Sequence, residues 1–421
     1  MLRTVSQPLR CLLVISAALS TPLIAASAEP SARLKHKLVR GVERCLLNRA
    51  FVMGVDFERW PDILAKHMST VEESTTNYAL ASGFNRALAE FDVSHLQVAT
   101  PALMAARRDG RTVGAGLKVV PIAAGQLVTS VAGDSPAAAA GLERGDLIVS
   151  VDGTPVAGGE PYLELIDYRL SGAPGTTRRV AWLRDGEAFE AAIGFAEFAA
   201  APPIALDWIG DIAWLRVPSF LWQVYDRPTI ENAFSEISTR ANGLVIDIRS
   251  NSGGRFSNVM HLASFLVPQG TTGGIITERK DYLRRRQALA RRDMPAEQRL
   301  QQLGDAIPIT MEIGSRPFAG PLVVLIDGAA GSGGDLFPAI MQDQRDATLV
   351  GATTAGALLG GQWCDLAGGF ELVFPSQEIL RPSGGRIEGV GVAPDIELSP
   401  VETVDDEHIR NVALELFAVA Q

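Results

Sequence analysis

The sequence predicts three parts: a helical N-terminal region, a small β-rich domain and an α/β core. Residues 29–105 mix polar and apolar positions at helical spacing. Residues 106–198 consist of short apolar runs that glycines interrupt, which is typical of strands joined by turns. Residues 199–421 alternate strand-like and helix-like segments, and this alternation indicates parallel βαβ units with buried strands.

The composition supports a folded protein and excludes several classes. The chain is 47% hydrophobic and 20% charged, so it can bury substantial cores and is not a disordered chain. Its formal net charge of −10 argues against a sequence-independent nucleic-acid binder, which needs a basic face. Three cysteines among 421 residues exclude a disulfide scaffold, although Cys45 and Cys364 can pair in an oxidising compartment.

The first 28 residues have the pattern of a cleaved signal peptide. Arg3 and Arg10 make the n-region basic, residues 11–25 form an apolar run, and the small residues 26–28 predict cleavage before Glu29. The apolar run is shorter than the ~20 residues that a membrane-spanning helix needs. We therefore expect an exported protein, periplasmic or secreted, without stable membrane insertion; an uncleaved anchor is the alternative.

In the predicted core, each of the first three apolar strands is followed by a helical stretch. The strands are expected at residues 211–217, 244–248, 321–327 and 347–351. The helices are expected at residues 229–241, 255–266 and 333–342. Within the β-rich domain, two helical stretches are expected near residues 137–141 and 161–170.

The segment 270–318 interrupts this alternation. Between Arg279 and Arg299 it contains eight basic residues, seven arginines and one lysine. A charge run of this kind usually marks an exposed face, so the segment is interpreted as a solvated helical insertion. The alternative is a lid or docking arm over an active site.

Ser332 stands at a glycine-rich turn between a predicted strand and a predicted helix. In an open parallel sheet, ligands bind where strands end in such turns. A serine at this turn can act as a nucleophile, because the N–H groups at the start of the helix stabilise a developing oxyanion. The local pattern fits a helix-capping serine equally well. The candidate oxyanion donors are the N–H groups of Gly333, Gly253 and Gly254.

A serine nucleophile needs a base, and the chain has only five histidines and five lysines. His95 lies where the helical region changes to extended chain. Taken singly, a histidine at such a place is more often a structural hydrogen-bonding residue than a catalyst. His261 is expected to pack on its helix, and His408 lies in an acidic C-terminal stretch.

Taken together, the motifs resemble the carboxy-terminal processing, or tail-specific, serine peptidases, a family that includes the tricorn protease core. The resemblance covers roughly residues 90–400. It implies a crotonase-like peptidase core of ββα units, a PDZ-like domain over 106–198, and Ser332 as the nucleophile. From the residues themselves we expect neither a metal nor a cofactor, because the histidines are scattered and no Cys/His ligand spacing occurs. The motifs that carry the resemblance are Gly114–Leu117, Ser135–Ile148, Asp247–Gly254, the Ser332 turn and Gly389–Ile396.

The resemblance also selects the base. Bacterial members commonly use a lysine, but Ala357 stands at the lysine position and no lysine follows Lys280. The tricorn-like branch instead uses a Ser-His pair before the PDZ region and a glutamate before the Gly-Val-x-Pro-Asp motif. Ser94, His95 and Glu388 stand at those places, which implies that His95 is the base and that the other two orient it. Asp335 occupies a position that usually holds glutamate.

The PDZ-like domain implies recognition of protein tails. The N–H groups of its carboxylate-binding loop would bind a terminal carboxylate while the tail adds as a strand to a sheet edge. Leu117 would line the pocket for the last side chain; the alternative is that the domain is only a spacer. The loop consists of Gly114, Ala115, Gly116 and Leu117.

These observations lead to one principal function and two alternatives. The principal hypothesis is an exported serine endopeptidase that cleaves flexible or C-terminal segments of proteins through an acyl-enzyme. A catalytically inactive PDZ scaffold is the first alternative. The second is another serine hydrolase that uses Ser332, Asp395 and His408, although the turn lacks the first glycine of a nucleophile elbow. No metal-ligand spacing and no phosphate-binding loop occurs.

Overall fold

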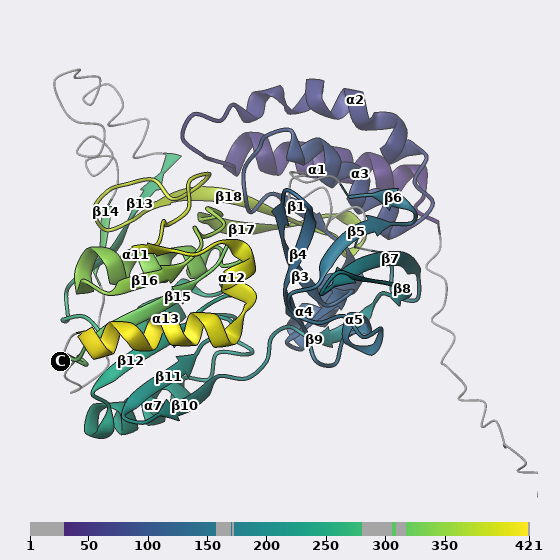
Figure 1. The fold of residues 1–421 in the computed structure, drawn as a ribbon. Helices are drawn as coiled ribbons and strands as arrows, with labels where there is room; N and C mark the ends of the chain where they lie inside the picture. The colour runs from purple at the N-terminus through teal and green to yellow at the C-terminus, as the bar shows by residue number, and fades with distance from the viewer. Residues whose placement is uncertain (1–28, 157–169, 171, 280–304, 309–316, 420–421) are drawn as a thin grey trace, which may run out of the picture.

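The computed structural model describes residues 29–156, 170, 172–279, 305–308 and 317–419. The predicted signal peptide, residues 1–28, lies outside the described residues. Figure 1 shows the N-terminal helices in purple, the β-rich domain in blue and the α/β core in green and yellow. Among the described residues, no helix is both long and apolar enough to cross a membrane.

The N-terminal region is helical, as predicted. Side chains at the N-caps of two of its helices, Ser31 and Thr76, accept backbone N–H groups and so start these helices. Its buried face packs around Trp60 and Phe84 and continues into the second sheet described below. The helices are α1 (Ala32–Arg49), η1 (Phe57–Arg59), α2 (Trp60–Glu72), α3 (Asn77–Ala89) and, nearer the β-rich domain, α4 (Pro101–Arg108).

The middle region is a small β domain with its own core around Trp182 and Phe195. Its main sheet has the order β3-β4-β5-β7-β8, and β2 pairs with β9 in a separate ribbon. Among the described strands β3 pairs only with β4, so its other edge is open. The elements are β2 (Arg111–Gly114), β3 (Leu117–Ile122), β4 (Gly125–Val131), α5 (Pro136–Ala139), β5 (Leu147–Val151), β6 (Thr154–Pro155), β7 (Thr177–Arg184), β8 (Glu187–Gly194) and β9 (Ala196–Ala199). The helix predicted near 161–170 lies almost entirely outside the described residues.

The core contains a six-stranded sheet in which five strands are parallel, as the alternating pattern predicts. The strands follow chain order, and the first is antiparallel to the second. They are β10 (Ala205–Ile209), β11 (Ile212–Arg216), β12 (Gly243–Asp247), β15 (Leu322–Ile326), β16 (Thr348–Gly351) and β19 (Ile396–Glu397). The crotonase-like detail of the predicted fold remains a prediction.

Helices cover both faces of this sheet. Alternate strand residues point to opposite faces, so Leu244 and Ile246 pack on one side and Val245 on the other. The first side is covered by α7 (Arg227–Arg240), α8 (Phe256–Ser264) and α11 (Gly333–Arg345), and the second by α13 (Asp406–Val419), which follows α12 (Pro400–Val404).

A second sheet connects the N-terminal helices to the core. Its long strand β18 (Glu371–Leu380) pairs with β17 (Leu359–Asp365) in a hairpin, with β1 (Gln97–Ala99) and with β13 (Thr272–Glu278). The turn η3 (Ala367–Gly369) joins β17 to β18, and β14 (Asp305–Pro308) pairs with β13. The helical interpretation of 270–318 is therefore wrong for β13 and β14. These two short strands lie on either side of the charge run, which led to a helix being predicted for the whole segment. Residues 280–304, with most of that run, lie outside the described residues.

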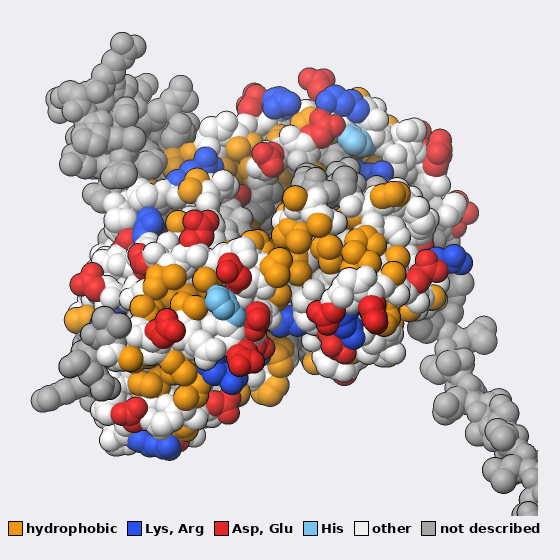
Figure 2. All heavy atoms as spheres, in the orientation of Figure 1, with side chains coloured by type: hydrophobic (Ala, Val, Ile, Leu, Met, Phe, Trp, Pro, Cys, Tyr) orange, Lys and Arg blue, Asp and Glu red, His pale blue; other side chains and the backbone are white. Residues whose placement is uncertain are grey.

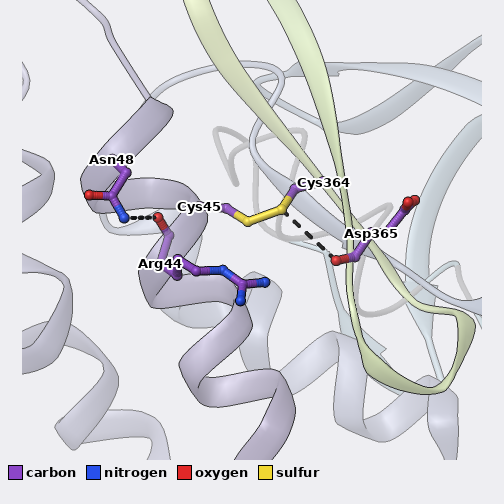
Figure 3. Close-up of a disulfide and its surroundings, with 5 residues drawn as sticks. All are labelled: Arg44, Cys45, Asn48, Cys364 and Asp365. Atoms are coloured by element: carbon purple, nitrogen blue, oxygen red, sulfur yellow. Dashed lines mark hydrogen bonds between the residues drawn. A yellow bond between two sulfur atoms is a disulfide. The ribbon is translucent and has the colours of Figure 1, made fainter.

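Cys45 and Cys364 form a disulfide. Figure 3 shows that it joins helix α1 to strand β17. The sequence allowed this pairing without establishing it. The bond ties the N-terminal region to the hairpin that passes beside the candidate active site.

Candidate active site

Ser332 lies at a sharp turn between β15 and α11, as predicted. Its backbone has a positive φ, with φ 56° and ψ −113°, a conformation that costs energy for a residue with a side chain. The Ser332 N–H donates to the carbonyl of Ala357 (3.0 Å) and to Oδ2 of Asp335 (2.7 Å). These contacts hold the turn in its strained form.

His95 lies next to Ser332 in the fold but far from it in the sequence. Its Nε2 atom lies 3.2 Å from Oγ of Ser332, although 237 residues separate the two. His95 itself has a φ of 56° in the bend between α3 and β1. Gly361 of β17 faces the ring, because a Cβ built there would lie 3.3 Å from Cδ2 of His95. The structure therefore brings together the predicted nucleophile and the predicted base.

Ser94 and Glu388 continue the chain of contacts behind His95. Oγ of Ser94 lies 2.8 Å from Nδ1 of His95 and donates to Oε2 of Glu388 at 2.8 Å. A hydroxyl has one proton to donate, and Ser94 donates it in the hydrogen bond to Glu388, so its oxygen must accept a hydrogen bond from Nδ1–H of His95. That assignment leaves the lone pair on Nε2 directed at Ser332. The imidazole has the tautomer that a general base requires.

Burial shifts the pKa values of His95 and Glu388 in this hydrogen-bonded series. It lowers the pKa of His95 to about 4, so the imidazole is neutral near pH 7. Burial also raises the pKa of Glu388, although the two hydrogen bonds from Ser94 act against this rise. A neutral base oriented by an acceptor is suited to remove a proton from a hydroxyl.

Three backbone N–H groups were predicted to bind an oxyanion, and the structure distinguishes among them. The N–H of Gly253 donates to Oδ1 of Asn251 at 2.8 Å, so it is already engaged. For the N–H groups of Gly254 and Gly333, no partner occurs among the described residues. Gly253 instead allows close packing, since a Cβ there would lie 2.6 Å from Cβ of Ser332.

Asp335 is a buried centre of hydrogen bonds beneath the Ser332 turn. Besides Ser332, it accepts from Oγ1 of Thr354 (2.5 Å), the N–H of Gly356 (2.9 Å) and the N–H of Ala357 (3.0 Å). Burial raises its pKa, and these four donors act against that rise. Asp335 thus joins the nucleophile turn to the loop that contains Gly356 and Ala357.

Lys118 is a site residue that the sequence analysis missed. It follows the Gly114–Leu117 loop on β3, and its Nζ donates to the carbonyl of Ser250 (2.5 Å) and to Oγ of Ser252 (3.3 Å). Burial lowers its pKa to about 8. Ser250 begins the loop that contains Gly253 and Gly254, so a side chain of the β domain supports the oxyanion loop. In the sequence, the only feature that pointed to Lys118 was the rarity of lysine.

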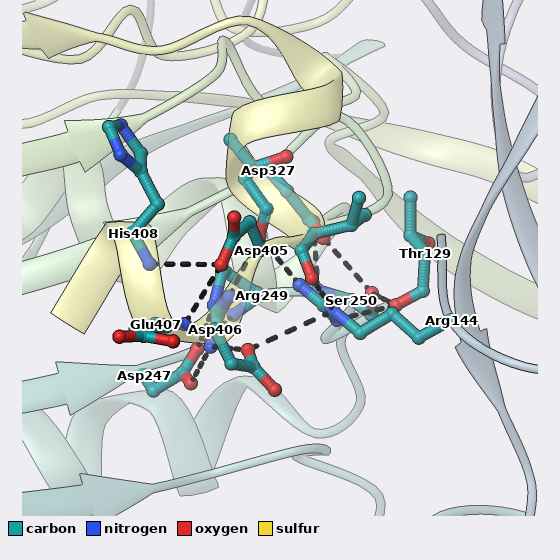
Figure 4. A network of polar contacts seen from close by, with 12 residues as sticks. Thr129, Arg144, Asp247, Arg249, Ser250, Asp327, Asp405, Asp406, Glu407 and His408 are labelled. Carbon is teal, nitrogen blue, oxygen red and sulfur yellow. Dashed lines mark hydrogen bonds and ion pairs between the residues drawn. The ribbon is translucent and has the colours of Figure 1, made fainter. Parts of the chain in front are cut away.

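A second contact fixes the β domain on the core (Figure 4). Arg144 donates to the carbonyls of Thr129 (2.5 Å) and Thr403 (2.7 Å), which lie on β4 and α12. Arg249 donates to the same Thr403 carbonyl at 2.8 Å and binds the carboxylate of Asp247. Burial alone would raise the pKa of Asp247, but the attraction of Arg249 outweighs it and lowers this pKa to about 2. The strand end at Asp247 is thereby locked to the β domain.

The predicted carboxylate-binding loop of the β domain opens on the same space as Ser332. Gly114, Ala115, Gly116 and Leu117 line a cleft of about 1970 Å³ that also contains His95 and Ser332. No backbone partner occurs among the described residues for the N–H groups of Ala115 and Gly116. The N-terminal helices, the β domain and the core all contribute walls to this cleft.

The residues of the alternative hydrolase are not brought to Ser332. The Asp395 carboxylate accepts the N–H of Leu349, and His408 pairs with Glu402 on the neighbouring helix at 3.9 Å. His261 is buried and its Nδ1 lies 2.9 Å from the Tyr225 hydroxyl, so it packs as expected. Within the described part of the chain, no three His, Cys, Asp or Glu side chains form a group that could hold a metal.

Comparisons with known proteins agree with this architecture. Residues 211–398 match the sequence model of peptidase family S41, and residues 127–184 match that of a PDZ domain. The S41 match contains Ser332 and Glu388, whereas Ser94 and His95 lie before its start.

Two curated relatives and one solved structure are similar over much of the chain. The chloroplastic C-terminal processing peptidase of Tetradesmus obliquus is 27% identical over 74% of this chain and 66% of its own length. The carboxy-terminal-processing protease of Bartonella bacilliformis is 27% identical over 64% of this chain and 57% of its own length. The photosystem II D1 C-terminal processing protease shares the fold, with a TM-score of 0.58 at 22% identity over 90% of this chain and 97% of that one.

The matched region thus spans two thirds or less of these two relatives, while the fold extends over nearly the whole chain. The order of the parts is the one that the motifs indicate, with a helical region, a PDZ domain and the S41 core. The chain therefore carries a region similar to the S41 peptidases over residues 211–398 and a PDZ domain over residues 127–184.

Proposed function

We propose that this protein is an exported serine endopeptidase that cleaves flexible or C-terminal segments of proteins through an acyl-enzyme. One observation carries the proposal: hydrogen bonds run without a gap from Glu388 through Ser94 and His95 to Ser332. In this series of hydrogen bonds the Glu388 carboxylate orients the Ser94 hydroxyl, and the hydroxyl orients the His95 imidazole, which faces the nucleophile.

In the first half-reaction, Oγ of Ser332 attacks the scissile carbonyl while its proton passes to Nε2 of His95. The negative charge that develops on the carbonyl oxygen is stabilised by the N–H groups of Gly333 and Gly254. The C–N bond then breaks, and the imidazolium returns its proton to the leaving amine. The products of this step are an ester on Ser332 and a released fragment.

In the second half-reaction, water takes the place of the leaving amine. His95 removes a proton from the water as its oxygen attacks the ester carbonyl; the C–O bond to Ser332 then breaks, His95 returns the proton to Oγ, and the second fragment leaves with a new carboxyl group. The same two N–H groups stabilise the second oxyanion. The chain needs no metal or cofactor for these steps.

The proposal does not require the lysine that Ala357 replaces. The Ala357 carbonyl accepts the Ser332 N–H, so this loop has a structural task. His95 supplies the base from the opposite side of Ser332. The inactive-scaffold alternative rested on the missing lysine and on Asp335 in the place of a glutamate. The presence of another base at hydrogen-bonding distance weakens the first of these grounds.

We further propose that the PDZ domain binds substrate tails and that the chain is exported. Its Gly114–Leu117 loop faces the Ser332 cleft, and β3 has an open edge onto which an extended tail can add. The pattern of residues 1–28 supports export, and one relative is named as chloroplastic.

The test is cleavage of an unfolded protein that ends in an apolar C-terminal tail. The chain from Glu29 onward, Ser332→Ala and His95→Ala are compared, with His67→Ala as a matched control because His67 pairs with Glu90 on the surface. We expect both site variants to lose at least about a thousandfold in kcat and the control to retain full activity. If the intact protein binds the tail but does not cleave it, the scaffold alternative holds.

A further inference from the structure

The described wall of the cleft that contains Ser332 has basic residues and no acidic ones. No Asp or Glu occurs among the described residues of its wall. The whole chain, by contrast, has 48 acidic and 38 basic residues, and Figure 2 shows both signs interspersed on the outer face. The cleft therefore concentrates positive charge in a protein of net negative charge. Its basic residues are Arg107, Arg108, Arg111, Lys118 and Arg255.

Three of these five cations already have partners. Lys118 donates to Ser250 and Ser252, as described above. Arg108 lies 4.0 Å from the carboxylate of Glu371. Arg111 lies 3.8 Å from the carboxylate of Glu197 and donates to its carbonyl.

Arg107 and Arg255 differ from the other three. Among the described residues, neither guanidinium has a hydrogen bond or an ion pair, and Glu371 acts on Arg107 only at a distance. Burial lowers the pKa of Arg107, which shows that its charge is held at a cost in solvation. Each of these two arginines therefore lines the cleft and has guanidinium donors without a partner among the described residues.

The loop 221–223 contacts both arginines, Arg107 through Gln223 and Arg255 through Trp222. The carbonyl of Arg107 accepts from Nε2 of Gln223 at 2.5 Å. The adjacent Trp222 is 56% exposed, and Cζ of Arg255 lies 5.6 Å from its ring centroid. An aromatic face restrains a guanidinium and leaves its edge available for a carboxylate.

We infer that Arg255, together with Arg107, is a carboxylate-binding subsite that makes the enzyme prefer acidic substrate segments. This inference rests on the proposed function, because it names the substrate class of that site. Arg255 directly follows Gly254, a candidate oxyanion donor. Since an extended chain advances roughly 3.5 Å per residue, the bound Asp or Glu lies within about three residues of the scissile bond. Arginine binds such a carboxylate through two parallel hydrogen bonds.

The test uses matched peptides with amidated C-termini. One peptide has glutamine at all six positions around the scissile bond, and six others each carry one glutamate. A further peptide has glutamine throughout and a free C-terminal carboxylate two residues after the bond. For the intact enzyme we expect one glutamate position to raise kcat/KM by about tenfold or more, and added salt to reduce this ratio.

The variants then assign the preference to residues. Arg255→Gln is expected to bring the Glu-to-Gln ratio close to one, Arg107→Gln to reduce it, and Arg255→Lys to restore part of it. The matched control is Arg240→Gln, because Cζ of Arg240 lies over the Trp208 ring at 4.0 Å but outside the cleft. A ratio near one in the intact enzyme overturns the inference, and so does a ratio that survives in both arginine variants. A preference for the free C-terminus alone also overturns it.

A binding measurement separates failure of this inference from failure of the proposed function. The affinities of the glutamate and glutamine peptides for Ser332→Ala are measured in the presence and absence of Arg255→Gln. Tighter binding of the glutamate peptide that Arg255→Gln abolishes supports the subsite even if the intact protein cleaves nothing. Equal binding of both peptides overturns the subsite even if cleavage is normal.

Discussion

The carboxylate of Glu388 binds Ser94 twice, through its backbone N–H at 2.7 Å and through its hydroxyl at 2.8 Å. The first bond fixes where the chain turns before His95, and the second directs the hydroxyl at Nδ1. One side chain therefore determines both the position and the tautomer of the proposed base.

Replacing Ser94 tests this orientation directly. Ser94→Ala removes the acceptor of Nδ1–H, so we expect kcat to fall by about 10- to 100-fold while KM changes little. Ser94→Thr keeps the hydroxyl and should restore most of the activity. The measurement is steady-state cleavage of a short peptide. Equal activity of the alanine and threonine variants would show that the hydroxyl has no role in orienting His95.

The pH dependence of cleavage reports the protonation of His95. Its pKa is lowered to about 4 from 6.5, so the base stays neutral well below pH 6.5. We expect kcat/KM to be level near neutral pH and to fall only as the pH drops through about 4. An acid limb centred near pH 6.5 contradicts this expectation.

The same shift affects stability. The unfolded chain binds a proton at His95 below pH 6.5 that the folded chain resists until about pH 4. The folded protein therefore loses stability between these two values as the pH falls. Circular dichroism over the same pH range separates loss of fold from loss of the base.

Lys118 offers a test of the link between the PDZ domain and the oxyanion loop. Lys118→Met removes the bonds to Ser250 and Ser252, and charge-assisted hydrogen bonds contribute about 1.5–3 kcal/mol. We expect at least about a tenfold loss in kcat, measured with a peptide too short to reach the PDZ loop. The control is Lys66→Met, because Lys66 lies on the surface with Glu90. Full activity of Lys118→Met would show that the loop needs no support from β3.

We predict that Asp335 stabilises the fold and that it affects catalysis only through this structural role. Asp335→Asn replaces one acceptor oxygen by an N–H₂ group that faces existing donors, at a cost of about 3 kcal/mol or more. A fall of several degrees in Tm is expected, together with loss of activity. The control is Asp346→Asn at the exposed left-handed end of α11, where asparagine fits the backbone. An unchanged Tm for Asp335→Asn contradicts the structural role.

The elements that the sequence predicts well are those whose pattern is local. Buried strands such as β12 and β15, and the helices that follow them, depend on runs of apolar residues that a reader of the sequence can see. Strand β13 was missed because its pairing partner, β18, lies about a hundred residues further along the chain. The charge run beside it favoured the wrong interpretation.

The site shows the same division. The Ser332 turn and the Ser94-His95 pair have recognisable motifs, and their contact depends on a fold that the resemblance implied. Whether Gly253 or Gly254 has a free N–H depends on the side chain of Asn251, which no spacing rule reveals. Lys118 binds a loop that lies 132 residues further along the sequence, and no motif next to Lys118 predicts that contact.

The disulfide between Cys45 and Cys364 holds the molecule together if the protease cleaves itself. It closes a covalent loop of 319 residues that includes His95 and Ser332. A protease that nicks itself once anywhere inside that loop yields two fragments that remain one molecule. We expect such a nicked species to migrate as a single band on a gel without reductant and as two bands with it, and Cys45→Ala/Cys364→Ala to separate without reductant.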